Sequence, residues 1–299
     1  MSIQETATLS SAGEYLEELN GVKLRFRVSG SGPVCILQTP GWGPEIAAYR
    51  ELAGFEDTFT MVYLDTRGSG GSERPDDSTF TFENFAADVD GVRRFLGADQ
   101  VVAMGHSFAG VLCIEYTLRY PRSVAGLILL DAVVAEVPEA QRDRQQRIDK
   151  MRGEPWLPDA IDALETIMGG YVPTSDEEFA SFVGRFLPPY FVDQSICARF
   201  QEGLAAAVWS HDAYRGSLNL EMFELDLRPR LREIDAPALV VVGSADFICG
   251  PIQSQWAHEN LRNSVLMEVQ GVGHFPWLEA PHEFFSRAKK ELRDLGIRA

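Results

Sequence analysis

A serine between small residues stands where an apolar run of the sequence gives way to a helical pattern. Ser107 follows the apolar residues 101–104, with Gly105 two positions before it and Ala109 two positions after it. Small residues at these two positions permit the sharp strand-to-helix turn of a nucleophile elbow, which exposes the serine hydroxyl. We therefore predict that Ser107 is a nucleophile. The competing interpretation is a helix N-cap, since serine commonly caps a helix through its hydroxyl.

A serine hydroxyl attacks a carbonyl near neutral pH only when a base removes its proton and an acid orients that base. Among the five histidines, His274 is the candidate base, because it lies in a glycine-rich loop between the last predicted strand, residues 265–269, and the last helical pattern. His106 adjoins the predicted nucleophile, and we expect it to point to the opposite side of the turn. Of the others, His211 falls in a predicted helical insertion. His258 and His282 lie within helices or at the start of one.

Two aspartates follow buried-strand patterns and are candidates for the acid. Asp246 follows the apolar residues 239–242 through a short turn, and it completes the chain order Ser, Asp, His. Asp131 ends the apolar run 124–130 and is the rival. We predict that Asp246 orients the imidazole.

Acyl transfer also needs hydrogen-bond donors for the negative charge that develops on the carbonyl oxygen. The backbone amide of Phe108, directly after the predicted nucleophile, is one candidate. The second is expected from the bend at residues 39–44, where Pro40 and Pro44 have no amide proton to donate. We predict that Trp42, which lies between them, is the second donor of this oxyanion hole.

The elements that must position these residues alternate between strands and helices. Apolar and polar residues alternate on both sides of Asn20-Gly21, which predicts an antiparallel hairpin. Helical patterns lie at residues 82–96 and 108–120 and from Pro281 onward. Unbroken apolar runs suit strands covered on both faces; they are residues 34–37, 59–64, 101–104, 124–130 and 238–242. The chain is therefore expected to form an α/β fold, a doubly wound, mostly parallel sheet with an N-terminal antiparallel hairpin.

One segment without strand patterns interrupts this alternation. Residues 133–232 contain helical stretches broken by proline and glycine, so we predict a helical cap inserted into a core of residues 1–132 and 233–299. We expect most of its aromatic residues to pack within the cap and any that face the core to line an apolar substrate pocket. These residues are Trp156, Phe179, Phe182, Phe186, Tyr190, Phe191, Phe200, Trp209 and Tyr214.

The net charge of the chain limits the classes of binding partner that we expect. The chain of 299 residues has a formal net charge of −17, which disfavours nucleic acids and anionic membrane surfaces. Neither a signal-like run nor a membrane-spanning run is visible, so we expect a soluble cytoplasmic protein with a small-molecule or short-peptide substrate. The oligomeric state stays open.

The cysteines do not suggest a metal site. All four are scattered, without the spacing of zinc ligands, and we expect buried thiols and no metal. Cys249 lies close to the predicted acid and is expected to line the pocket. The others are Cys35, Cys113 and Cys197.

A glycine-rich turn at residues 65–72 follows the fourth predicted strand. It lacks the lysine and the spacing of a phosphate-binding loop. We therefore expect a structural turn in which Asp65 and Arg67 pair.

Together these motifs resemble those of the α/β-hydrolase superfamily, in particular of proline iminopeptidase-like hydrolases. The resemblance covers nearly the whole core but hardly the cap. It implies an α/β-hydrolase fold, a catalytic triad of Ser107, Asp246 and His274, and no cofactor. The matching motifs are Gly105-His106-Ser107 and residues 65–72, 243–246 and 273–275.

The sequence departs from the family at residues 40–44, where a histidine and glycine bend is usual, and this puts the Trp42 side chain near the pocket. An aminopeptidase must also neutralise a substrate ammonium, and the candidate cap carboxylates form no discriminating pattern: Glu154, Glu177, Glu178, Glu202 and Asp212. We therefore predict a serine hydrolase that cleaves an ester, lactone or amide of a small, largely apolar molecule through an acyl-enzyme. The alternatives are a proline iminopeptidase, a carbon–carbon bond hydrolase and a non-catalytic ligand-binding protein.

Overall fold

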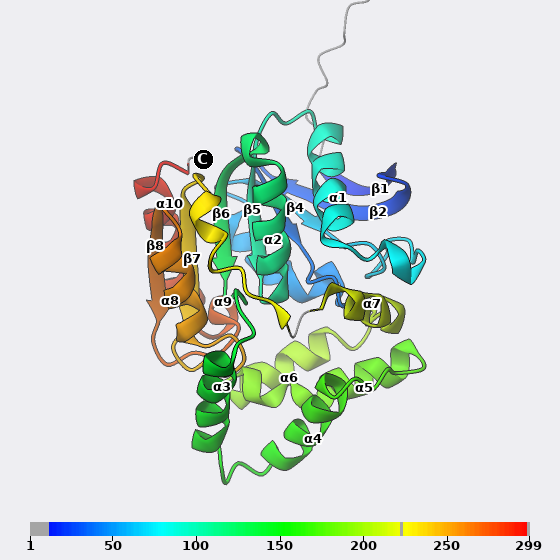
Figure 1. The fold of residues 1–299 in the computed structure, drawn as a ribbon, viewed down its shortest axis with the longest axis vertical. Helices are drawn as coiled ribbons and strands as arrows, with labels where there is room; N and C mark the ends of the chain where they lie inside the picture. The colour runs from blue at the N-terminus through cyan, green and yellow to red at the C-terminus, as the bar shows by residue number, and fades with distance from the viewer. Residues whose placement is uncertain (1–11, 222–223, 298–299) are drawn as a thin grey trace, which may run out of the picture.

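An eight-stranded sheet forms the centre of the computed structural model, which describes residues 12–221 and 224–297 (Figure 1). The strand order is β1-β2-β4-β3-β5-β6-β7-β8. Strand β2 runs antiparallel to both β1 and β4, and the other neighbours are parallel. The strands are β1 (Gly13–Leu19), β2 (Val22–Gly30), β3 (Val34–Gln38), β4 (Thr60–Leu64), β5 (Val101–His106), β6 (Val124–Leu130), β7 (Ala238–Gly243) and β8 (Ser264–Val269). This confirms the predicted α/β architecture.

The predicted hairpin is also present. Leu19 pairs with Val22, and the two turn residues between them, Asn20 and Gly21, have φ angles of 51° and 72°. Positive φ at both central residues is the requirement of a type I′ turn, which Asn-Gly meets with little strain. The turn therefore fixes the register of β1 on β2.

Helices cover both faces of the sheet. On β5, Val102 and Met104 pack against the face that carries the 3₁₀ segment Ile46–Phe55, while Val101 and Ala103 pack against α1 and α2. This alternation along a strand buried on both sides explains the unbroken apolar run. The helices of the two faces are α1 (Phe82–Phe95), α2 (Phe108–Arg119), α8 (Pro251–Asn260), α9 (Pro276–Glu279) and α10 (Pro281–Asp294).

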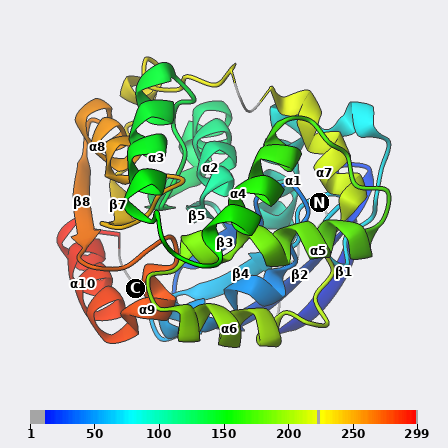
Figure 2. The same ribbon diagram turned by 90° about the horizontal axis from the view of Figure 1, so that it is seen from below.

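Within the described residues, five α-helices lie between β6 and β7 in the sequence and gather beyond the carboxyl ends of the strands (Figures 1 and 2). They are α3 (Pro138–Lys150), α4 (Leu157–Met168), α5 (Asp176–Phe186), α6 (Gln194–Gly203) and α7 (His211–Ser217). Pro138 and Pro158 lie in the first turns of α3 and α4, where proline needs no amide proton. None of the described helices is long and apolar enough to cross a membrane.

The turn after β4 is structural, but its predicted ion pair was wrong. Asp65 pairs with Arg25 on β2 and also accepts the amides of Ile46 and Gly71. Burial raises the pKa of Asp65 to about 6, although these bonds oppose the shift. Arg67 instead reaches α1, where both its Nε and Nη2 contact the carboxylate of Asp88 at 2.7 and 2.6 Å. The two side chains leave the turn in different directions and so cannot meet.

Candidate active site

Ser107 lies at the junction of β5 and α2 in a strained backbone conformation. Its φ of 56° and ψ of −126° lie outside the regions that non-glycine residues usually adopt. A side chain at Gly105 would collide with the carbonyl of Ala109, and one at Gly110 would collide with the Cβ of Ala132. Within the described chain, the Ser107 side chain makes no capping hydrogen bond to α2, which argues against the N-cap interpretation.

Asp246 and His274 form a buried hydrogen-bonded pair after the ends of β7 and β8. Oδ2 of Asp246 lies 2.8 Å from Nδ1 of His274. The other carboxylate oxygen accepts the amides of Ile248 and Cys249, at 2.9 and 3.3 Å, which fixes the orientation of the carboxylate. Because a carboxylate only accepts, Nδ1 of His274 carries the proton between them. Nε2 is then free to act as an acceptor.

His106 lies against His274 and not on the opposite side of the turn, so that prediction was wrong. The two ring centroids are 4.3 Å apart, and Nε2 of His106 lies 2.9 Å from the carbonyl oxygen of His274. Since a carbonyl only accepts, Nε2 carries a proton, and Nδ1 accepts from the Tyr49 hydroxyl at 3.3 Å. Burial, and then the neighbouring His274, lower the pKa of His106 well below its ordinary value. The neutral ring thus tethers the loop that carries His274.

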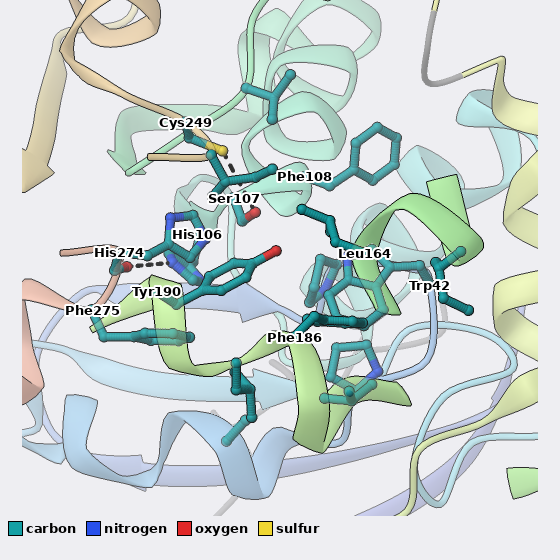
Figure 3. Close-up of a pocket in the computed structure, with 18 of the residues that line it drawn as sticks. Trp42, His106, Ser107, Phe108, Leu164, Phe186, Tyr190, Cys249, His274 and Phe275 are labelled. Carbon is teal, nitrogen blue, oxygen red and sulfur yellow. Dashed lines mark hydrogen bonds between the residues drawn. The ribbon is translucent and has the colours of Figure 1, made fainter. Parts of the chain in front are cut away.

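The Ser107 hydroxyl contacts the thiol of Cys249, with 3.8 Å between Oγ and Sγ (Figure 3). Ser107, Cys249 and His274 line one cavity, as was predicted for Cys249. Within the described residues, the hydroxyl has no hydrogen bond to His274. All four cysteines are buried and free, as the sequence indicated.

Cys249 also belongs to a group of possible metal ligands. Its Sγ, an oxygen of Asp246 and a nitrogen of His274 all lie within 4.8 Å of one another. Metal binding requires a thiolate, but burial and the charge of Asp246 raise the pKa of Cys249 well above its ordinary value. The Asp246–His274 hydrogen bond already accounts for the other two side chains. This chemistry therefore fits proton transfer better than metal binding.

Asp131, the rival acid, is held apart from His274. Its Oδ1 accepts the amide of Gly243 at 2.8 Å, and its Oδ2 has no partner among residues 12–221 and 224–297. Burial, and then the negative charge of Asp246, raise the pKa of Asp131 well above its ordinary value. A buried carboxyl beside a second carboxylate is thereby kept neutral. The carboxylate that contacts the imidazole is Asp246.

The two predicted oxyanion donors differ in their surroundings. The amide of Phe108 begins α2, where a helix offers no carbonyl four residues earlier. The amide of Trp42 donates to the carbonyl of Pro40 within the bend. The Trp42 side chain lines the cavity, as its position in the bend indicated, and stacks on Trp209 with 6.2 Å between ring centroids.

A cavity of about 180 Å³ lies between the strand ends and the inserted helices. Its walls are mainly aromatic and aliphatic, which suits an apolar ligand. Six aromatic residues that were expected in the helical segment line it: Phe179, Phe186, Tyr190, Phe200, Trp209 and Tyr214.

Sequence reasoning missed two charged side chains in the cavity wall. Glu136, just before α3, forms an ion pair with Arg144 on α3, and both line the cavity. No local pattern identifies them, because their burial depends on how α3 packs. The carboxylates considered for a substrate ammonium are not among the described lining residues: Glu154, Glu177, Glu178, Glu202 and Asp212.

Comparison with known proteins agrees with this fold. Residues 36–281 match the family described as alpha/beta hydrolase fold. The chain is 27% identical over 266 residues to the proline iminopeptidase PfmaB of Pestalotiopsis fici, a match that covers 86% of this chain and 91% of that protein.

Solved structures give the same fold at lower sequence identity. An enol-lactonase from Burkholderia xenovorans superposes with a TM-score of 0.70 at 20% identity, covering 93% of this chain and all of that one. A thermophilic esterase from Thermogutta terrifontis gives a TM-score of 0.69 at 21% identity, covering 95% of this chain and 99% of that one. The folding pattern is thus shared with hydrolases that carry different names.

Proposed function

The chain belongs to the α/β hydrolase fold family, and from this premise we propose that it is a serine hydrolase acting on a small, largely apolar ester, lactone or amide. The observation that carries the proposal is the buried hydrogen bond between Asp246 and Nδ1 of His274. It leaves Nε2 of His274 as the acceptor in a cavity that the Ser107 hydroxyl also lines. Such a base is what a serine nucleophile requires.

In the proposed reaction, the Ser107 hydroxyl exchanges its contact with Cys249 for one with Nε2 of His274. His274 takes the hydroxyl proton while Oγ bonds to the substrate carbonyl carbon, whose π electrons move to the oxygen. As the tetrahedral species collapses, His274 protonates the leaving alcohol or amine. A water molecule then attacks the acyl-enzyme with His274 again as base, and the acid and free Ser107 result.

Backbone amides are proposed to stabilise the oxyanion. The amide of Phe108 follows the nucleophile directly and is the first donor. Trp42 is the second, and its amide must exchange the carbonyl of Pro40 for the substrate oxygen. Removing one such donor typically lowers the rate about 10²–10³-fold.

Residues 133–232 are proposed to act as a cap on the core of residues 1–132 and 233–299. Leu164 on α4, Phe186 at the end of α5 and Tyr190 between α5 and α6 contribute to the cavity wall. The aromatic and aliphatic character of this wall supports an apolar substrate. The esterase and lactonase names of proteins with the same fold are compatible with that substrate class.

Labelling with a fluorophosphonate, combined with turnover of p-nitrophenyl acetate, tests the proposal. We expect stoichiometric labelling at Ser107, many turnovers per protein molecule, and loss of both in Ser107→Ala. Failure of wild-type protein to label or turn over would instead favour a non-catalytic ligand-binding protein.

Proline iminopeptidase activity is the second candidate, because a relative with that name aligns over 86% of the chain. The reaction needs a carboxylate for the substrate ammonium, and the carboxylate in the described cavity wall, Glu136, is already paired with Arg144. We therefore favour acyl esters and lactones. Comparing kcat/KM for prolyl p-nitroanilide with that for p-nitrophenyl esters and simple lactones distinguishes the two, and a preference for the prolyl substrate would reverse our choice.

A further inference from the structure

Within the described chain, a guanidinium group with one unpartnered N–H, the Nε of Arg144, belongs to a residue in the wall of the largely apolar cavity. Nη2 of Arg144 contacts Oε1 of Glu136, and the two side chains are only 11% and 9% exposed. Nε of Arg144 is buried and has no partner among the described residues. A buried N–H without an acceptor is unfavourable, so the site is incomplete without one.

Arg144 lines the same cavity as the candidate nucleophile, Ser107. Burial raises the pKa values of Cys249 and Tyr190 far above their ordinary values, and the charge of Arg144 partly offsets both shifts. Cys249 in turn touches Ser107, with 3.8 Å between Sγ and Oγ. A molecule that fills this cavity can therefore contact both Ser107 and Arg144.

Charge balance restricts what this donor can bind. Because Glu136 neutralises Arg144, adding a carboxylate or an ammonium would leave one uncompensated charge in a largely apolar cavity, which is unfavourable. An uncharged oxygen acceptor satisfies the free N–H and adds no charge. A carbonyl oxygen is the simplest group of this kind.

We propose that Arg144 binds a second, uncharged carbonyl oxygen of the substrate, separate from the carbonyl that Ser107 attacks. The inference rests on the proposed serine hydrolase function and specifies its substrate class: oxo esters, acylated lactones or related molecules with two carbonyl groups. Glu136 is a positioning residue, because its carboxylate holds the guanidinium in place.

Paired substrates that differ only in this carbonyl test the proposal. The acyl series compares p-nitrophenyl 4-oxopentanoate, 5-oxohexanoate and 6-oxoheptanoate with the plain esters of equal chain length. A second series compares acetates of keto alcohols with acetates of the matching plain alcohols. Hydrolysis of these acetates is measured by the release of acid. p-Nitrophenyl hemiglutarate and prolyl p-nitroanilide supply a carboxylate and an ammonium.

Three variants accompany the wild type. Arg144→Met removes the donor, and the double variant Glu136→Gln/Arg144→Met also removes the carboxylate left unpaired in the wall. Arg142→Met on the same helix is the matched control, since Arg142 is exposed and pairs with Glu139 outside the described cavity wall.

We expect wild type and Arg142→Met to prefer at least one keto substrate over its plain counterpart by about tenfold or more in kcat/KM. In both Arg144 variants the ratio of kcat/KM for the keto substrate to that for its plain counterpart should fall to about one, mainly through a higher KM for the keto substrate. Equal activity of wild type on both members of every pair would overturn the inference while leaving the hydrolase proposal intact.

Preference for hemiglutarate would also overturn it, since Arg144 would then act as a charge site. So would a preference for prolyl p-nitroanilide that Arg144→Met retains and the double variant Glu136→Gln/Arg144→Met loses, because Glu136 would then be the ammonium site. If wild type neither hydrolyses plain esters nor labels at Ser107, the hydrolase proposal fails and this inference fails with it.

Discussion

The strand ends and the inserted helices face one another across the same cavity, but they differ in how completely their polar side chains are hydrogen-bonded. At the strand ends, Asp246 is fixed by two amides and by His274, and His106 is fixed by Tyr49 and a carbonyl. The helices contribute mostly apolar side chains, together with Arg144, which keeps a free donor. We conclude that the first region is built for one fixed chemical arrangement and the second for selecting what enters it.

The largest difference between the regions should appear when the nucleophile is removed. We predict that Ser107→Ala lowers kcat for p-nitrophenyl acetate by up to about 10⁶-fold, as loss of a serine nucleophile does in other triad enzymes. Fold and thermal stability should change little, which circular dichroism can verify. Activity within tenfold of wild type would show that the reaction does not need this hydroxyl.

Two neighbouring carboxyl groups allow a sharper test within the strand-end region. Asp246→Asn should lower kcat by about 10⁴-fold, because an amide stabilises the wrong tautomer of His274. Asp131→Asn should lower it by less than about tenfold, since an amide resembles the neutral carboxyl that burial maintains there. Steady-state kinetics of the two matched variants decides the assignment, and the opposite ranking would make Asp131 the acid.

A substitution on the inserted helices, where they line the cavity, should alter substrate selectivity more than the rate of reaction. Leu164 on α4 is buried and lines the cavity, so Leu164→Ala enlarges it. We predict that kcat/KM for esters with longer acyl chains rises about tenfold, while kcat/KM for the acetate ester changes little. A tenfold change is the size of effect that one to two methylene groups have in an apolar pocket. An equal loss on all chain lengths would indicate that this wall supports the reaction itself.

The Asp131→Asn variant, which should change the rate little, should also change how the stability of the fold depends on pH. Burial, and then the charge of Asp246, raise the pKa of Asp131 in the folded chain well above the value of about 3.9 that an aspartate has in an unfolded chain. The folded state therefore binds more protons, and this group lowers wild-type stability as pH rises. Asp131→Asn lacks that contribution.

The free energy of unfolding of Asp131→Asn should thus increase relative to that of wild type between pH 5 and pH 8. Urea unfolding at both values measures the difference. A relative stability that falls with rising pH would mean that Asp131 is ionised in the folded protein.

The predictable parts of the molecule are those that local sequence determines. Asn20-Gly21 specifies a turn type, and the small residues around Ser107 are required by backbone contacts within a few positions. Chain order favoured Asp246 over Asp131 as the acid, and the structure places Asp246 within hydrogen-bond distance of His274. These features can be predicted without knowing how elements far apart in the sequence pack against one another.

The features that were missed depend on elements far apart in the sequence. His106 meets His274 across 168 positions, and Arg67 reaches α1 because of how that helix crosses the sheet. The burial of Glu136 and Arg144 likewise depends on the placement of α3. Single charged residues carry no periodic signal, so the sequence alone does not distinguish a buried pair from a solvated surface.

Acid-quenched mass spectrometry during turnover of p-nitrophenyl acetate tests the central claim most directly. We predict one acetyl group on the peptide that contains Ser107 in wild-type protein, and its absence in His274→Ala. Continued turnover with the acetyl group on Cys249, on His274 or on no residue would contradict it.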